Sequence, residues 1–274
     1  MERAAAPSEP GVEVARTVER VAPPRLPEPV PARFPYIGDE AAPRARLAPC
    51  NRAALRERRV LLPDDGAAAA HAYRMLRTQL LRRVRAERLK TIGVVSAVDG
   101  EGKTLTAVNL ALSIAAEPNQ TVLLVDLDLR QPQMAKLLGL SVVHGLEAWL
   151  EGTVSELAPL YVGLEGLERL RVLPTLRPLS GSSELLAGAR GRELPAALAG
   201  AAGADTLAIV DLPPVLLADD VLAFAPLLDG VLLVVSEGRT KREDVLRTRE
   251  LLHGVRLLGT VLNVASESEK RTYS

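Results

Sequence analysis

Apolar and polar positions follow a regular order along the chain from residue 64 onward. Short apolar runs predict strands, and stretches with an apolar residue every three or four positions predict helices between them. Runs such as residues 122–125 do not alternate with polar positions, which is typical of parallel strands covered on both faces. Strands in turn with helices predict right-handed βαβ units, and therefore an α/β fold with a doubly wound, mainly parallel sheet.

The predicted elements begin with a helix over residues 67–85, which Asp64 or Asp65 is expected to cap. The expected strands cover residues 91–96, 121–126, 170–173, 206–211, 230–235 and 256–263. The later helices are expected over residues 103–116, 183–198, 219–227 and 242–253, with short helices within 132–150. These elements fit one α/β domain of ordinary size.

Residues 1–63 have a different composition. They contain 11 of the chain's 20 prolines and only two glycines, and they show no sustained apolar period. Because proline removes a backbone donor and fixes φ, we expect a largely disordered segment or linker, in which a helix over residues 53–59 would be marginal. The expected organisation is a Pro/Ala/Arg-rich segment over 1–63, a P-loop domain over 64–265 and a flexible tail over 266–274.

Composition narrows the class of protein. The 274 residues include 34 basic and 34 acidic side chains, so a basic platform for nucleic acid is excluded. The single cysteine, Cys50, excludes a disulfide framework and a thiolate zinc site. No apolar run approaches the roughly 18 residues of a membrane span, and the first residues lack a signal-peptide core. We therefore expect a cytoplasmic protein that reaches the membrane only through a partner.

The strongest chemical signal lies in residues 96–104, between a predicted strand and a predicted helix. From Ala97 to Thr104 the chain reads A-x-x-x-x-G-K-T, the pattern of a P-loop whose backbone N–H groups surround phosphate. Lys103 is expected to bridge the β and γ phosphates, and the Thr104 hydroxyl to bind magnesium. A glycine turn with an incidental lysine is the competing interpretation, which the flanking strand and helix disfavour. The expected nucleotide contacts are Gly100, Glu101, Gly102, Lys103, Thr104 and Leu105.

Carboxylates follow two other predicted strands. Asp126, Asp128 and Arg130 are spaced two apart, so they share a face at the carboxyl end of their strand, where open α/β sheets bind ligands. Two carboxylates there fit a magnesium ion or a role in proton transfer, and a capped strand end is the alternative. Asp211 ends the apolar run 207–210 before two prolines, as in a Walker B strand, and is expected to reach magnesium directly or through water.

Together these motifs resemble the bacterial tyrosine kinases of exopolysaccharide and capsule assembly, within the MinD/ParA-like P-loop ATPases. The similarity covers about residues 68–265, and a weaker one points to the branch that accompanies exosortase-linked systems. It includes Ala72-Tyr73-Arg74-Met75-Leu76-Arg77-Thr78, Gly100-Glu101-Gly102-Lys103-Thr104, Val125-Asp126-Leu127-Asp128-Leu129-Arg130, Asp211-Leu212-Pro213-Pro214 and Gly259-Thr260-Val261-Leu262-Asn263. The resemblance implies ATP and Mg²⁺ as cofactors.

The resemblance also assigns roles to individual residues. It implies that the catalytic base for a tyrosine hydroxyl comes from Asp126 and Asp128, and that Asp211 completes a metal site with Thr104 and Asp126. Asn263 matches the position that often reads the adenine edge. Arg74 and Arg77 match two arginines of a helix that joins subunits, which implies a homo-oligomer.

The chain departs from the family pattern at several positions. His71 stands where a carboxylate usually precedes Arg74 and Arg77, so ring assembly is in question, and a plain surface histidine is the simpler interpretation. The tail holds one tyrosine, Tyr273, which is either a phosphoacceptor or an ordinary terminal residue. Asp99 replaces a frequent proline. Val98 replaces the lysine with which partitioning ATPases reach their partner subunit, which favours the kinase branch.

Three hypotheses follow. The first is an ATP-dependent protein-tyrosine autokinase that regulates polysaccharide polymerisation or export with a membrane-bound co-polymerase, or chain-length determinant. The second is a nucleotide-dependent regulatory switch of the same systems without kinase activity. The third is a MinD/ParA-like positioning ATPase, which would require a C-terminal amphipathic helix that the polar residues after Ala265 do not predict.

Overall fold

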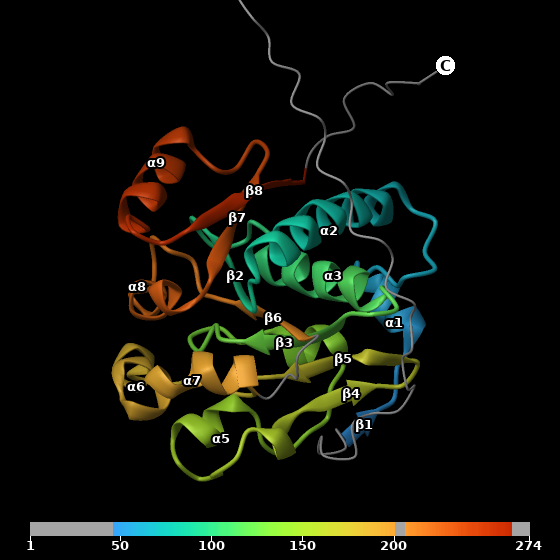
Figure 1. The fold of residues 1–274 in the computed structure, drawn as a ribbon, viewed down its shortest axis with the longest axis horizontal. Helices are drawn as coiled ribbons and strands as arrows, with labels where there is room; N and C mark the ends of the chain where they lie inside the picture. The colour runs from blue at the N-terminus through green and yellow to red at the C-terminus, as the bar shows by residue number, and fades with distance from the viewer. Residues whose placement is uncertain (1–45, 201–205, 265–274) are drawn as a thin grey trace, which may run out of the picture. The chain divides into compact units, whose positions relative to one another are not determined.

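The computed structural model describes residues 46–200 and 206–264. Its sheet has the strand order β1-β4-β5-β3-β6-β2-β7-β8 (Figure 1). In chain order the strands are β1 (Arg46–Ala48), β2 (Thr91–Ser96), β3 (Thr121–Asp126), β4 (Val162–Leu164), β5 (Leu167–Leu173), β6 (Thr206–Asp211), β7 (Gly230–Ser236) and β8 (Leu257–Asn263). Within the described residues every pair of neighbouring strands is parallel except β4 and β5, which confirms the mainly parallel α/β fold.

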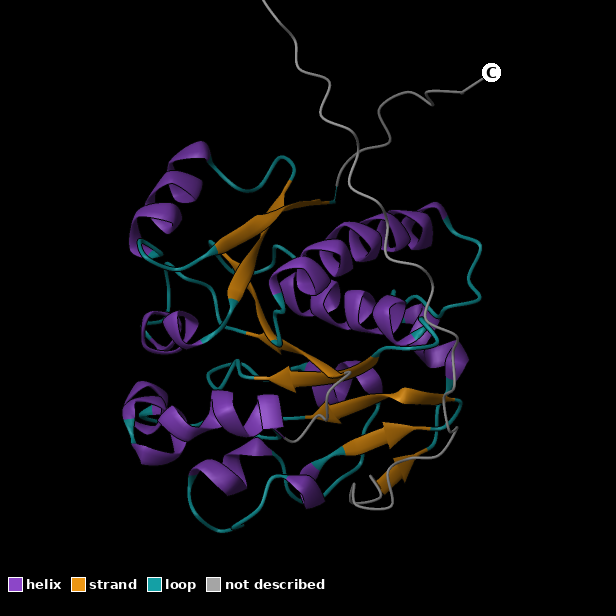
Figure 2. Ribbon diagram, viewed as in Figure 1, coloured by secondary structure: helices purple, strands orange, loops and turns teal. Residues whose placement is uncertain are grey.

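Helices connect these strands and cover both faces of the sheet (Figure 2). In chain order they are α1 (Arg52–Glu57), α2 (Ala68–Glu87), α3 (Lys103–Ala115), α4 (Met134–Leu138), α5 (Leu146–Leu150), α6 (Ser182–Ala187), α7 (Ala189–Gly200), α8 (Asp220–Phe224) and α9 (Arg242–Leu251), with single 3₁₀ turns at Ala158–Leu160 and Ala225–Leu227. The helix expected over 183–198 is thus two helices that meet at Gly188. Within the described residues, no helix is both long and apolar enough to cross a bilayer.

Alternate residues of the central strands enter two separate hydrophobic cores. Val122 and Leu124 of β3 pack with the helices α1–α4, whereas Leu123 and Val125 pack with α5–α9 on the other face. All four side chains are buried. The strands therefore read as continuous apolar runs because both of their faces are covered.

The chain joins this fold earlier than expected. β1 pairs in parallel with β4, and Leu55, Val60 and Leu62 are buried in the core beneath α2 and α3. The Asn51 side chain caps α1 by accepting a hydrogen bond from the Ala54 N–H at 3.1 Å. The folded domain therefore begins before the expected boundary between residues 63 and 64. Three scattered apolar residues and a three-residue strand form no periodic pattern, so the sequence did not indicate this earlier start. Residues 1–45, 201–205 and 265–274, which include the expected tail over 266–274, lie outside the described residues.

The start of α2 also differs from the prediction. Ala67 occupies the cap position without a side-chain hydrogen bond. Asp65 instead accepts a hydrogen bond from the Leu62 N–H at 2.8 Å and pairs with Arg56, while Asp64 pairs with Arg52. Both carboxylates thus fasten α1 and the segment after it rather than capping α2.

Candidate active site

The loop between β2 and α3 has the shape of a phosphate cradle. Gly100 and Gly102 take left-handed φ angles of 75° and 80°, and α3 begins at Lys103. A Cβ at Gly102 would lie 2.1 Å from the Asn263 side-chain nitrogen, so only glycine fits there. The loop and the first turn of α3 present backbone N–H groups on one side, which favours an anion. The sequence prediction of the loop's position and of its glycines agrees with this geometry.

Lys103 is buried, and carboxylates surround its ammonium group. Its Nζ donates to Asp211 Oδ1 at 2.9 Å and to Asp128 Oδ2 at 3.2 Å, and lies 3.4 Å from Thr104 Oγ1. Burial alone would lower the pKa of Lys103, but Asp211 and Asp128 outweigh this effect and the pKa is raised. The motifs of three separate segments therefore meet at one cation.

Asp126 and Asp128 have different surroundings although both follow β3. Asp126 is fully buried and accepts from the backbone N–H groups of Asp128 at 3.2 Å and Met134 at 3.0 Å. Burial, and then the charge of Asp211, raise the pKa of the Asp126 carboxyl well above its usual value. Asp128 instead lines the cavity beside Lys103 and accepts from the Gln131 N–H at 3.0 Å. Asp128 is thus the carboxylate that an incoming group meets first.

Asp211, at the end of β6, uses only one of its two carboxylate oxygens in hydrogen bonds with described residues. Oδ1 accepts from Lys103, but no hydrogen bond from a described residue reaches the buried Oδ2. Burial raises the pKa of this carboxyl, although Lys103 opposes the shift. A buried carboxylate oxygen without a partner and the Thr104 hydroxyl are oxygen donors of the kind that Mg²⁺ takes together with water and substrate phosphates. No group of three or more His, Cys, Asp or Glu side chains among the described residues is arranged to hold a metal by itself.

A cavity of about 200 Å³ lies over the P-loop. Besides the loop it is lined by Asp128, Gln131 and Gln133 from the segment after β3, and by Arg58 from the segment after α1. Arg58 Nη1 donates to the carbonyls of Lys136 at 2.9 Å and Leu137 at 3.2 Å, near the end of α4. Nothing in the local sequence marks Arg58 as a site residue, because it lies in a segment that was expected to be a linker.

Glu101 and Asn263, two expected nucleotide contacts, are instead bonded to the loop. The Glu101 carboxylate is fully buried and accepts from the N–H groups of Ala97 and Val98. Asn263 Nδ2 donates to the Glu101 carbonyl at 2.8 Å. Leu105, also expected to contact the nucleotide, is half-buried and lines the cavity.

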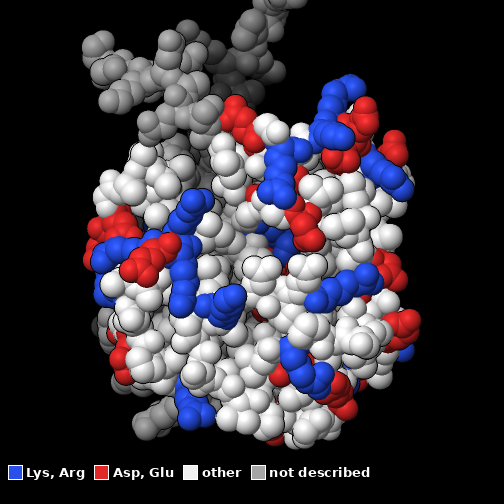
Figure 3. Space-filling model, turned by 180° about the vertical axis from the view of Figure 1, so that it is seen from behind, with Lys and Arg blue, Asp and Glu red and all other residues white. Residues whose placement is uncertain are grey.

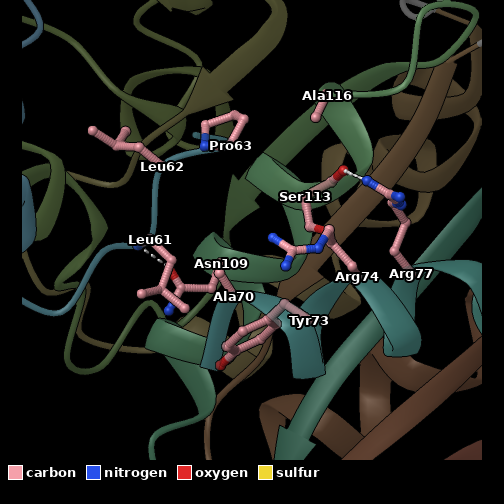
Figure 4. Close-up of a pocket in the computed structure, with 10 residues that line it drawn as sticks. All are labelled: Leu61, Leu62, Pro63, Ala70, Tyr73, Arg74, Arg77, Asn109, Ser113 and Ala116. Carbon is pink, nitrogen blue, oxygen red and sulfur yellow. Dashed lines mark hydrogen bonds between the residues drawn. The ribbon is translucent and has the colours of Figure 1, made fainter. Parts of the chain in front are cut away.

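Arg74 and Arg77 lie on α2, away from the cavity over the P-loop. Arg77 Nη1 donates to the Ser113 carbonyl at 3.0 Å (Figure 4). Its guanidinium also pairs with Glu117 at 2.9 Å. Both arginines line a small pocket of about 30 Å³ between α2, α3 and residues 61–63. Arg77 therefore fastens α2 to α3 within the chain, while His71 is exposed one turn before Arg74. Tyr273 lies outside the described residues.

Charges of both signs are dispersed on the face shown in Figure 3, and no broad area of that face carries basic side chains alone.

The class of protein follows from the fold and the site together. The strand order, the P-loop, the buried lysine and the paired carboxylates define a P-loop nucleotide-binding protein. The expected absence of a nucleic-acid partner stays a prediction.

Comparisons with known proteins identify the family. No protein-family model matches the chain. The tyrosine-protein kinase YwqD of Bacillus subtilis (strain 168) is 30% identical over 226 residues, which cover 81% of this chain and 93% of YwqD. The succinoglycan biosynthesis transport protein ExoP of Rhizobium meliloti (strain 1021) is 32% identical over 191 residues, 68% of this chain but only 23% of ExoP. The chain belongs to the bacterial tyrosine-protein kinases.

Solved structures agree with this assignment. The kinase domain of the Escherichia coli tyrosine kinase ETK aligns with a TM-score of 0.68 and 29% identity, covering 76% of this chain and 80% of that domain. A cobyrinic acid a,c-diamide synthase from Mycobacterium smegmatis, solved with an ATP analogue and magnesium, aligns with a TM-score of 0.52 and 26% identity over 64% of this chain and 74% of the synthase. The fold is thus shared with kinases and with a magnesium- and nucleotide-binding enzyme.

Proposed function

We propose that this chain is an ATP- and magnesium-dependent protein-tyrosine kinase that phosphorylates tyrosines of its own kind. It acts in polysaccharide polymerisation or export, at the inner face of the membrane, where a membrane-bound co-polymerase holds it. Family membership, with relatives that include tyrosine kinases and a succinoglycan transport protein, supports this proposal.

One observation carries the proposal: Lys103 is held between Asp128 and Asp211 at the mouth of a phosphate cradle. Thr104 and Asp211 would hold magnesium, which would supply positive charge at the phosphate oxygens. Lys103 supplies a second positive charge, and the loop amides fix the phosphates in position. Asp128, which lines the cavity, orients an acceptor hydroxyl and takes its proton late, since phosphoryl transfer depends mainly on positioning and charge. Asp126, held by two backbone N–H groups, fixes the segment that carries Asp128.

Full-length protein incubated with Mg-ATP and analysed for phosphotyrosine by mass spectrometry tests the proposal. Wild type should carry phosphotyrosine, with Tyr273 the first candidate, and Lys103→Met should carry none. Lys136→Met, which removes an exposed lysine outside the cavity, should label as wild type does. Persistent labelling of Lys103→Met would reject the assignment of the site.

The regulatory switch is the second candidate, favoured by His71 in place of a carboxylate and by the single tail tyrosine. ATP binding without phosphotyrosine, also in the presence of a co-expressed co-polymerase, would support the switch over the kinase. ATP-dependent dimers without phosphotyrosine would support a positioning ATPase, which Val98 disfavours because it replaces the lysine of that class. Genes for glycosyltransferases and a chain-length determinant beside this gene would support the polysaccharide role.

A further inference from the structure

Glu101 is a buried carboxylate in a loop that is built to hold an anion. It is 0% exposed, and both of its oxygens are used within the protein. Oε2 accepts from the Ala97 N–H at 2.7 Å and the Val98 N–H at 3.1 Å, while Oε1 accepts from the Thr240 hydroxyl. A negative charge here would repel phosphate if it faced the cradle, so these partners indicate a role in the shape of the loop.

The first two amides of the loop explain why a carboxylate is needed. The cradle amides begin near Gly100 and continue into α3, whereas Ala97 and Val98 precede it and turn the other way, toward Glu101. Ala97 is buried, and leaving its N–H without an acceptor would cost stability. A carboxylate accepts both hydrogen bonds with one oxygen, and hydrogen bonds to a charged acceptor are stronger than those to a neutral one.

Thr240 connects this carboxylate to a neighbouring strand. Its Oγ1 donates to Glu101 and accepts from the Ser236 N–H, at the end of β7, at 2.7 Å. β7 is bonded to β2 up to the pair Ser96 and Val234, where the P-loop begins. A closed ring of hydrogen bonds therefore runs from the P-loop through Glu101 and Thr240 to the end of β7, and back through the pairing of β7 with β2. The loop cannot shift relative to the sheet unless one of these bonds breaks.

A second contact holds the same residue from its backbone side. Asn263, the last residue of β8, donates to the Glu101 carbonyl and packs against Gly102. Glu101 is thus fixed through its side chain by the turn after β7 and through its carbonyl by the end of β8.

The geometry points to Glu101 as a positioning residue that, with Thr240, holds the P-loop in its phosphate-binding shape before nucleotide arrives. This inference rests on the nucleotide site of the proposed function and adds a role for the side chains of two residues, which are bonded within the protein and not turned toward the phosphates. We call the hydrogen bonds that Glu101 makes with Ala97, Val98 and Thr240 the brace. Because a preformed loop loses less conformational entropy on binding, the brace acts mainly on nucleotide affinity. Breaking it should raise KM for ATP and Kd for ADP by a larger factor than it lowers kcat.

The test compares full-length wild type with Thr240→Val, Thr240→Ser, Glu101→Gln and the double variant Glu101→Gln/Thr240→Val. Thr240→Val should bind Mg-ADP about tenfold more weakly, because it removes a hydrogen bond to a charged acceptor. Thr240→Ser keeps the hydroxyl and should restore binding. The double variant should be no weaker than Glu101→Gln alone, because both changes break the same ring of hydrogen bonds. Thr153→Val is the matched control, because this exposed threonine lies outside both the P-loop and the turn after β7.

Hydrogen exchange without nucleotide gives a readout that does not depend on kinase activity. The amides of Ala97 and Val98 should exchange faster in Thr240→Val than in wild type or Thr240→Ser, with a single cooperative thermal unfolding transition in each variant as a check of folding. Unchanged hydrogen exchange together with unchanged ADP affinity in Thr240→Val would overturn the proposal that Glu101 and Thr240 hold the P-loop in shape. If wild type itself bound no nucleotide, the proposed function would fail, and faster exchange in Thr240→Val would still show that the brace exists.

Discussion

The loops that follow β2 and β3 reach the same edge of the sheet, but they are built differently. The β2 loop offers backbone N–H groups and glycines, and its one buried carboxylate, Glu101, is turned inward on the loop. The β3 segment offers the carboxylates Asp126 and Asp128, which backbone N–H groups hold in place. The first loop uses dipoles to bind an anion, and the second uses charged side chains that handle protons or a cation.

The two designs differ in electrostatic cost. Oriented peptide dipoles bring no net charge into the interior, so burying the phosphate cradle costs little electrostatic energy. Asp126 and Asp211 bring carboxyl groups into a site where both are fully buried, and their pKa values are raised. Lys103, which belongs to the first loop, compensates the second. The site therefore holds its own counterion until phosphate and metal arrive.

Asp126→Asn breaks the β3 side and has the largest expected effect. Kinase activity should fall by about a hundredfold or more, because this carboxyl organises the segment that carries the base. Stability should change in the opposite direction. The pKa of Asp126 is raised in the folded state, so folded wild type keeps a proton that the unfolded chain releases above pH 3.8. The stabilisation from that proton is complete below pH 3.8 and is lost as pH rises through the raised pKa.

Thermal unfolding measured across pH checks this reversal. Asn cannot ionise, so Asp126→Asn should melt at a higher temperature than wild type at neutral pH, with the advantage shrinking toward pH 4. Asp99→Asn, an exposed carboxylate in the neighbouring loop, is the control and should change the pH profile little. A variant that melted below wild type at every pH would show that the hydrogen bonds of Asp126 outweigh the cost of its burial.

Gly102→Ala breaks the β2 side by a steric mechanism. The new Cβ would overlap the Asn263 side chain and force a left-handed φ of 80° on alanine. Gly166 has a similar φ of 77° with no atom within 4 Å of its Cβ position, so Gly166→Ala isolates the cost of the backbone angle, about 1 kcal/mol. Gly102→Ala should lose more stability than this, and ADP binding about tenfold or more. Denaturant titrations and ADP binding measure both, and equal losses in the two variants would mean that Asn263 moves aside freely.

Arg130→Met tests a weaker support of the β3 segment. Arg130 donates to the buried Asp220 at 2.7 Å and pairs with Asp219, and Asp220 also accepts from the Ser182 hydroxyl at 2.8 Å. Removing the arginine leaves a buried carboxylate without its cation, but Arg130 is 41% exposed, so the expected loss is about 1–2 kcal/mol with a few-fold lower kcat. Arg177→Met, which breaks an exposed pair with Glu151, should change neither measurably. Equal effects of the two variants would show that the buried pair is no stronger than the exposed one.

The sequence predicted what depends on local pattern. Apolar runs located the central strands, and the P-loop spacing, with Asp126, Asp128 and Asp211 at strand ends, located the carboxylates that the sheet brings to Lys103. Uninterrupted apolar runs indicate strands that are buried on both faces, and the order of runs and helical patterns indicates that strands alternate with helices. The inward turn of Glu101, the bond from Asn263 to its carbonyl and the approach of Arg58 depend on chain segments far apart, and no local pattern encodes them. The three-residue strands β1 and β4 were missed for the same reason.

The pairing of β1 with β4 has a consequence for synthesis of the chain. Arg46 pairs with Val162, which leaves the ribosome 116 residues later. At about 5–20 residues per second, this delay is roughly 6–23 seconds. During that time Leu55, Val60 and Leu62 have no complete core to enter, and they are available to chaperones or to neighbouring nascent chains. The first described strand of the kinase therefore finds its partner only after β2 and β3 have been made.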